Sequence, residues 1–319
     1  MQRPRFLPDN MTLLLLGVVL TASFFPARDH VAAFFDQLSV WMIALLFFMH
    51  GAKLSREAVI SGLTHWRLHL LVLSITFVAF PIMGLVLKPV VLPFLTPDLY
   101  IGILFLCMLP STVQSSIAFT SVAKGNVSGA VCSASASNLT GIFLTPLLVS
   151  LLLKTSGGSS SSLDGMLKIV VQLLLPFVAG QLARPLLQAW ITKHSQVLKM
   201  VDQSSILLVV FVAFSEAVVQ GLWSQVPIVM LLSILAISAL MLGMMMMLTI
   251  WLSRRLGFSK EDEITIVFCG SKKSLASGVP MAKVLFSSSS VGLVLLPLML
   301  FHQLQLMVCA VLAQRYAKR

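Results

Sequence analysis

Charged residues are scarce in this sequence. They make up 10% of its 319 residues, and only 11 residues are acidic, whereas about a quarter of an ordinary soluble domain is charged. Hydrophobic residues account for 58%, and mean hydropathy is +0.98. Apolar stretches of about 20 residues, the length that crosses a hydrocarbon core, follow one another from Met11 to Ala313. This composition excludes a water-soluble fold and predicts an all-α polytopic membrane protein.

The arrangements that enzymes use are also missing. No Ser-His-Asp arrangement, His-Glu-x-x-His run or paired catalytic aspartate occurs inside the apolar stretches, so an enzyme is not expected. No Gly-x-x-x-x-Gly-Lys motif is present, which argues against ATP-driven pumping. Cys107, Cys132, Cys269 and Cys309 lie singly in apolar surroundings, without the spacing of a disulfide framework or a metal site. No cofactor is therefore expected.

The net charge of +11 comes from lysines and arginines that are scattered in short connections. They form no basic face interleaved with aromatic residues, so nucleic acid is not an expected partner. If both termini lie in the cytoplasm, most of these residues fall on the inner side, which the positive-inside rule favours. We therefore expect a multi-pass plasma membrane protein with cytoplasmic termini, in a bacterial inner membrane.

The apolar runs between polar breaks predict ten transmembrane helices. They span approximately 11–26, 35–52, 66–87, 99–123, 127–153, 166–190, 204–223, 226–252, 263–286 and 290–313. The Gly- and Ser-rich stretch at 157–164 reads as a flexible linker between a first repeat, 1–156, and a second, 165–319. Because each half has an odd number of spans, the second half enters the membrane from the opposite side, as in inverted-repeat transporters.

Polar clusters interrupt the fourth span of each half. The first cluster contains Gln114, Ser115 and Ser116, and the second contains Ser271, Lys272, Lys273 and Ser274. Matched interruptions in inverted halves indicate broken helices around a binding site at the membrane midplane. Small residues that pack helices closely are the alternative reading of the serines, but this reading does not account for Gln114 or the lysines.

Two further groups extend this candidate site. An ammonium at the bilayer centre needs a partner, and Glu216 is the one acidic residue deep in an apolar run; the pair could also be purely structural. In the fifth span, Ser133 and Ser137 lie on one helical face, and Asn138 adds an amide that lipid would leave unpaired.

Five segments of the chain carry a family resemblance: Leu46–Leu54, Ser115–Asn126, Leu144–Pro146, Leu175–Gly180 and Phe268–Leu275. Through them the sequence resembles the bile acid:sodium symporter family over nearly its whole length, and within it the branch whose second crossover reads Cys-Gly-Ser-Lys-Lys-Ser. Thr120 and Asn126 join the candidate site through the second segment. The resemblance implies two inverted five-helix repeats that form a panel and a core domain, broken crossover helices 4 and 9, and alternating access.

Where the sodium-coupled members of that family carry ion ligands, this chain differs. Their glutamate pairs with Phe268, their Gln-Asn pair with Lys272 and Lys273, and two hydroxyl ligands with alanines. These departures count against sodium coupling. Sodium, if it is the coupling ion, is expected near Ser116, Asn138 and Ser271. A fixed ammonium could instead replace the cation, or the lysines could attract an anionic substrate directly.

The function predicted from these features is secondary-active transport of a small organic anion, such as a sterol conjugate or a carboxylate. Its expected partners are that solute and the lipid bilayer. The alternatives are a regulator or scaffold that retains the fold without transporting, and a channel. The predicted substrate- and ion-binding residues are Gln114, Ser115, Ser116, Thr120, Asn126, Ser133, Ser137, Asn138, Glu216, Ser271, Lys272, Lys273 and Ser274.

Overall fold

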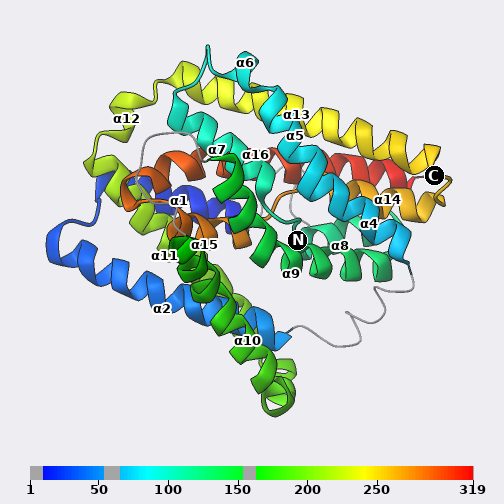
Figure 1. The fold of residues 1–319 in the computed structure, drawn as a ribbon, viewed down its shortest axis with the longest axis horizontal. Helices are drawn as coiled ribbons and strands as arrows, with labels where there is room; N and C mark the ends of the chain where they lie inside the picture. Colours follow the sequence, from blue (N-terminus) through cyan, green and yellow to red (C-terminus); the bar gives the residue numbers. More distant parts are fainter. Residues whose placement is uncertain (1–9, 54–64, 154–162, 319) are drawn as a thin grey trace, which may run out of the picture. The chain divides into compact units, whose positions relative to one another are not determined.

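The described residues of the computed structural model, 10–53, 65–153 and 163–318, form helices and no strand (Figure 1). Six of these helices are long and apolar enough to cross a membrane, and two shorter apolar helices, Leu13–Phe24 and Pro97–Met108, accompany them. The predicted all-α polytopic membrane fold is confirmed. A helix lies in each of the ten predicted intervals, whereas the number of crossings and the inverted repeat stay predictions.

The helices, in chain order, have the following bounds. They are α1 (Asn10–Phe24), α2 (Asp29–Lys53), α4 (Trp66–Ser74), the π-helical turn η1 (Ile75–Ala79), α5 (Phe80–Val86), α6 (Lys88–Val91), α7 (Pro97–Met108), α8 (Gln114–Val122), α9 (Val127–Leu152), α10 (Leu163–Lys193), α11 (Ser195–Val219), α12 (Leu222–Gln225), α13 (Ile228–Arg255), α14 (Lys260–Gly270), α15 (Leu275–Leu285) and α16 (Ser288–Ala317).

The chain divides into two compact units, and each draws on both predicted halves. Unit 1 comprises 1–54, 146–227 and 279–295, and unit 2 comprises 55–145, 228–278 and 296–319. The division runs through α9, α15 and α16, within two residues of a proline in each helix: Pro146, Pro280 and Pro297. The predicted linker falls largely outside the described residues.

In unit 1, α2 packs against α10 and α11, and α1 packs against α11. The backbones of α2 and α10 approach closely at Gly51 and Gly180. A Cβ added to either glycine would overlap a carbonyl oxygen of the other helix, of Phe177 or Phe48 respectively. Small residues allow such close contacts between membrane helices, where van der Waals packing drives association. Ion pairs join Lys53 to Asp202 and Lys283 to Asp36.

In unit 2, α14 packs against α4, α8 and α13, while α5 packs against α7 and η1. The largest fully buried side chains of this unit include Phe80, Phe105, Phe268 and Phe301, and the Phe80 and Phe301 rings meet edge to face at 6.4 Å. This packing surrounds two points where a helix is interrupted.

Both interruptions lie where the sequence predicts them. The residue before a proline disfavours the helical conformation, and Leu109, which precedes Pro110, is extended at ψ 154°. Helix α7 therefore ends at Met108, and α8 begins at Gln114. Helix α14 ends at Gly270, and α15 begins at Leu275. The predicted spans 99–123 and 263–286 are thus each a pair of short helices joined by a non-helical segment.

Candidate functional site

The first break leaves five consecutive carbonyl groups without a partner in their own helix, and each accepts a hydrogen bond from another segment. Lys273 Nζ donates to the carbonyls of Cys107 and Leu109, and Thr145 Oγ1 donates to that of Met108. Ser274 N donates to Pro110 O, and Asn138 Nδ2 donates to Ser111 O. A helix end inside a membrane must find such donors, because lipid offers none.

The second break is bound to the first in the same way. Ser116 Oγ donates to Phe268 O at 2.9 Å, and Ser111 Oγ donates to Cys269 O. Ser274 N completes the exchange by donating to Pro110 O at 2.9 Å. The two interrupted helices therefore meet at their breaks, and each supplies donors for the carbonyls of the other.

Helix α9 links to this meeting point through two side chains. Ser137 Oγ accepts from Ser111 N at 3.0 Å, and Asn138 Nδ2 donates to Ser111 O at 2.8 Å. The Asn138 Oδ1 accepts from Ser277 Oγ on α15 at 2.6 Å. Asn138 thus bridges one break to the helix that follows the other. Of the polar residues predicted on the fifth span, Ser137 and Asn138 contact the first break.

Lys273 has no exposed surface, and its ammonium is fully hydrogen-bonded. Nζ lies 2.8 Å from Thr76 O, 2.8 Å from Cys107 O and 2.7 Å from Leu109 O. It also lies 4.2 Å from the centre of the Phe80 ring, within cation–π range. An ammonium has three hydrogens, so three carbonyl acceptors use all of them.

Local sequence explains why these three carbonyls are available. In an α-helix Thr76 O would accept from Phe80 N, but in η1 that N–H bonds to Ile75 O, and Pro81 has no N–H to offer. Cys107 O would accept from Ser111 N, which bonds to Ser137 instead. Leu109 lies beyond the end of α7. The ammonium therefore stabilises backbone groups that the helices leave unpaired.

Gln305 on α16 fixes the backbone at Lys273. Its Oε1 accepts from Lys273 N, and its Nε2 donates to Lys273 O, both at 2.8 Å. His302, one turn earlier, contacts the same amide through Nδ1 at 2.8 Å. The second break is thus held at a non-helical residue by a side chain that supplies both a donor and an acceptor.

Lys272 is equally buried but points to different groups. Its Nζ donates to Ser115 Oγ at 3.1 Å and lies over the rings of Phe119 and Phe268, at 4.6 and 5.9 Å from their centres. Ser115 is partly exposed, and Gln114, the first residue of α8, is exposed. The Lys272 ammonium therefore contacts one hydroxyl group whose residue is partly exposed.

Neither lysine forms an ion pair within the part of the chain that the structure describes. Glu216, predicted as their partner, lies on α11 in unit 1, where it interacts electrostatically with Lys283 and Asp36. Within unit 2, backbone carbonyls, a hydroxyl and aromatic rings, which give no charge pattern in a sequence, contact the two ammonium groups, and a pairing with Glu216 stays a prediction. Within the described residues, the meeting point of the breaks therefore holds two buried lysine side chains with no carboxylate in contact.

The family of the chain is identified by a match along nearly its whole length. The profile of the SBF-like CPA transporter family matches residues 9–318. The chain belongs to this family. The resemblance to the bile acid:sodium symporter family predicted from the sequence is confirmed.

Individual relatives agree with this assignment. "Uncharacterized protein PA2026" of Pseudomonas aeruginosa is 63% identical over 319 residues, covering 100% of this chain and 96% of the relative. "Putative symporter YfeH" of Escherichia coli is 57% identical over 314 residues, covering 98% and 93%. "Sodium/bile acid cotransporter 7" of Rattus norvegicus is 27% identical over 276 residues, covering 85% and 80%. The chain is thus an integral membrane protein of a family of transporters rather than enzymes, and two of these relatives are named as a putative symporter and a cotransporter.

Among the described contacts, four predicted site residues of this transporter-family chain do not join one break to the other. Asn126 Nδ2 donates to Asp262 Oδ1 at 2.8 Å and joins the start of α9 to the start of α14. Ser133 Oγ contacts His69 Nδ1 at 2.7 Å, and Ser271, which lies in the second break, donates from Oγ to Val267 O of α14. Thr120 Oγ1 is buried without a hydrogen-bond partner among the described residues. These four residues bond to neighbouring helices or pack between them near the breaks.

Gln305 and Thr76 are among the residues at the meeting point that the predicted site does not include. Gln305 gave a usable signal, because it is an amide inside an apolar run. Thr76 gave only an indirect one, through Pro81 five residues later, since it contributes its carbonyl and not its side chain.

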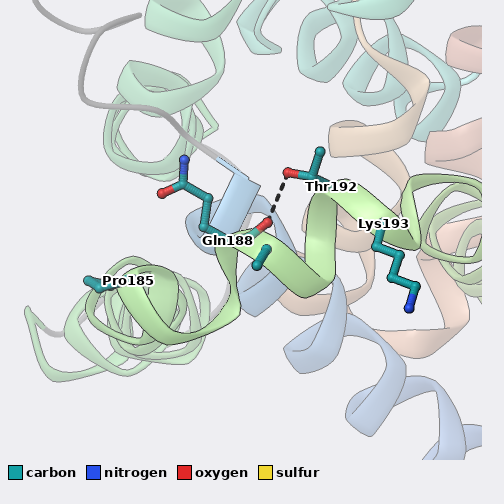
Figure 2. Close-up of a pocket in the computed structure, with 5 residues that line it drawn as sticks. Pro185, Gln188, Thr192 and Lys193 are labelled. Atoms are coloured by element: carbon teal, nitrogen blue, oxygen red, sulfur yellow. Dashed lines mark hydrogen bonds between the residues drawn. The ribbon is translucent and has the colours of Figure 1, made fainter.

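A hollow on α10 in unit 1 contains none of the predicted site residues. Figure 2 shows Pro185, Gln188, Thr192 and Lys193 around it, and Ala189 completes the lining. The Thr192 hydroxyl donates to the carbonyl of Gln188 one turn earlier. All five residues come from one helix, so the hollow lacks the convergent polar groups of a substrate site.

Proposed function

We propose that the chain is a secondary-active transporter of a small organic anion that works by alternating access. The carrying observation is the pair of buried ammonium groups where the two broken helices meet, with no acidic partner among the described residues. Intramembrane charges mark substrate or ion pathways by default. An anion is the solute that this excess of positive charge would attract.

Lys272 is the better placed of the two lysines to act on the solute. The hydrogens of Lys273 are all used by carbonyls, whereas the single described hydrogen bond of Lys272 leads to the partly exposed Ser115. Gln114 is exposed at the same helix start. We infer that an anionic group binds at Gln114 and Ser115, at the N-terminus of α8, with the Lys272 ammonium behind it.

The solute class rests on the relatives. The name of the rat relative refers to a sodium and bile acid cotransporter, which supports a sterol conjugate or another amphipathic carboxylate as the solute and makes sodium the first coupling ion to test. Two inverted five-helix repeats in a bacterial inner membrane, with cytoplasmic termini, are the architecture we propose for this carrier.

The test is ligand-induced thermal stabilisation of the purified protein across a panel of bile acids and smaller carboxylates, each with and without sodium. We expect at least one anion, but not its neutral amide analogue, to raise Tm. In Lys272→Gln the affinity for that anion should fall about tenfold or more, since a hydrogen bond to a charged group contributes roughly 1.5–3 kcal/mol. Lys199→Gln, which changes an exposed lysine of α11, is the matched control.

Three results would contradict this proposal. Equal stabilisation by neutral analogues would remove the role of the charges. Unchanged affinity in Lys272→Gln would remove that lysine from the site. If no solute shifts Tm and the substituted protein keeps its wild-type stability, the non-transporting scaffold becomes the better description.

A further inference from the structure

Three backbone carbonyls surround the Lys273 ammonium, and we name this group the carbonyl cage: the oxygens of Thr76, Cys107 and Leu109. The three Nζ–O distances are 2.8, 2.8 and 2.7 Å, and the cage is closed on another side by the Phe80 ring. Rings of carbonyl oxygens are what proteins use to replace the hydration shell of a monovalent cation in a membrane. The cage therefore has the chemistry of a cation site whose cation is covalently attached.

We propose that Lys273 is a tethered cation: its ammonium occupies a monovalent-cation site of this chain, so that no free ion is needed to hold the two broken helices together. The cage joins α7 and η1 to the second break, and Gln305 fixes the backbone from which the ammonium extends. This role deepens the proposed function, on which its consequence for coupling rests. A free cation cannot enter the cage while Nζ is there.

The places where sodium was expected from the sequence support the same conclusion. The Oγ of Ser116 is bonded to Phe268 O, Nδ2 of Asn138 to Ser111 O, and the Oγ of Ser271 to Val267 O. The three side chains thus donate hydrogen bonds to three different carbonyls and do not converge on one point. Within the described residues, the carbonyl oxygens that do converge on a cation converge on Lys273 Nζ.

The proposal is tested by melting temperature, without any transported solute. Lys273→Ala opens the cage and leaves three carbonyls without a donor. Lys273→Met removes the charge but refills the space with an uncharged chain. Lys272→Ala is the matched control, because it deletes the neighbouring, equally buried lysine, whose ammonium contacts a hydroxyl and two rings rather than a cage. Each protein is melted in choline, sodium, potassium and ammonium chloride at equal ionic strength.

We expect the wild type to melt at the same temperature in all four salts. Lys273→Ala should melt lower than wild type in choline chloride and recover in salts of cations small enough to enter the cage. Recovery should be greatest with ammonium and potassium, which match the size of the native group. At ten times the Kd of the ion the rise should be roughly 2–4 °C for a chain of this size. Lys273→Met and Lys272→Ala should melt alike in all four salts.

Two outcomes overturn the proposal. One is a melting temperature of Lys273→Ala that is equal in choline and in all small-cation salts. The other is a sodium-specific rise in the wild type, which needs no variant and decides the question even if Lys273→Ala does not fold. Since no organic anion is present, neither outcome depends on the proposed transport function, and failure of the anion panel leaves this test intact.

Discussion

The two adjacent lysines of the second break contact different groups. Lys272 and Lys273 lie in a non-helical segment, so their side chains diverge, one toward a hydroxyl and two rings and the other into three carbonyls. Burying an ammonium without a carboxylate costs much free energy unless such groups replace its hydrogen bonds to water. At the residue scale, the burial of a charge therefore depends on backbone that the helices leave unpaired.

Gln305→Leu tests the residue that holds this segment. The substitution leaves Lys273 N and O buried without their partner, and each unsatisfied group costs roughly 1–3 kcal/mol. We expect a clear drop in Tm and in resistance to denaturant. Met307→Leu, at an exposed position of the same helix, should leave both unchanged. Wild-type stability in Gln305→Leu would show that water or another side chain satisfies these groups.

Residue patterns predicted where the helices break better than they predicted what the lysines contact. Pro110 and the Gly270–Ser274 segment marked both breaks, and the spacing of Ser133 and Ser137 marked the face of α9. The hydrogen-bond partners of Lys273 could not be predicted from the sequence, because every residue has a carbonyl and only the fold decides which carbonyls lack a helical partner. An opposite charge such as that of Glu216 is visible in a sequence, whereas an unpaired carbonyl is not.

At the scale of elements, the contact between α2 and α10 depends on the absence of two side chains. Gly51 and Gly180 each lie against a carbonyl of the opposite helix, so a methyl group at either site forces the helices apart. Overpacking of this kind typically costs about 1–3 kcal/mol. This geometry makes the pair a sensitive probe of the packing in unit 1.

Gly51→Ala should therefore lower Tm, while Gly243→Ala should not. Gly243 lies inside α13 with no heavy atom within 4 Å of the position a Cβ would take. An alanine there is expected to be neutral or to stabilise by about 0.5–1 kcal/mol, because glycine weakens a helix interior. Thermal melting of the two variants in one detergent measures the difference. A drop of equal size in both would mean that the loss is not specific to the α2–α10 contact.

A second prediction concerns the charges that connect α2, α11 and α15. Lys283 pairs with Asp36 at 2.6 Å, and Glu216 interacts with both, so the buried ammonium has two carboxylates available. Asp36 is about half exposed, which screens its share. We expect Asp36→Asn and Glu216→Gln each to cost little, and the double variant to cost at least about 1 kcal/mol more than their sum. Additive losses in a melting or denaturant series would show that the carboxylates do not replace one another.

At the scale of the whole molecule, the predicted inverted repeat determines on which side of the membrane the equivalent connections of the two halves lie. The connection between α5 and α7 in the first half corresponds to that between α13 and α14 in the second, and the α8–α9 connection corresponds to α15–α16. Inverted repeats place the members of each pair on opposite sides of the membrane. Cytoplasmic termini then put Lys88 and Ser287 outside, and Lys124 and Arg255 inside.

Cysteine labelling tests this topology directly. The native cysteines Cys107, Cys132, Cys269 and Cys309 are all buried, whereas these four connection residues are exposed, so an added cysteine should dominate the signal. In intact cells, a membrane-impermeant thiol reagent should label Lys88→Cys and Ser287→Cys but reach Lys124→Cys and Arg255→Cys only after permeabilisation. Labelling of both members of a pair from the same side would mean that the halves are parallel or that the number of crossings differs from ten. The reverse pattern at all four sites would keep the inverted repeat and place the termini outside, against the distribution of lysines and arginines.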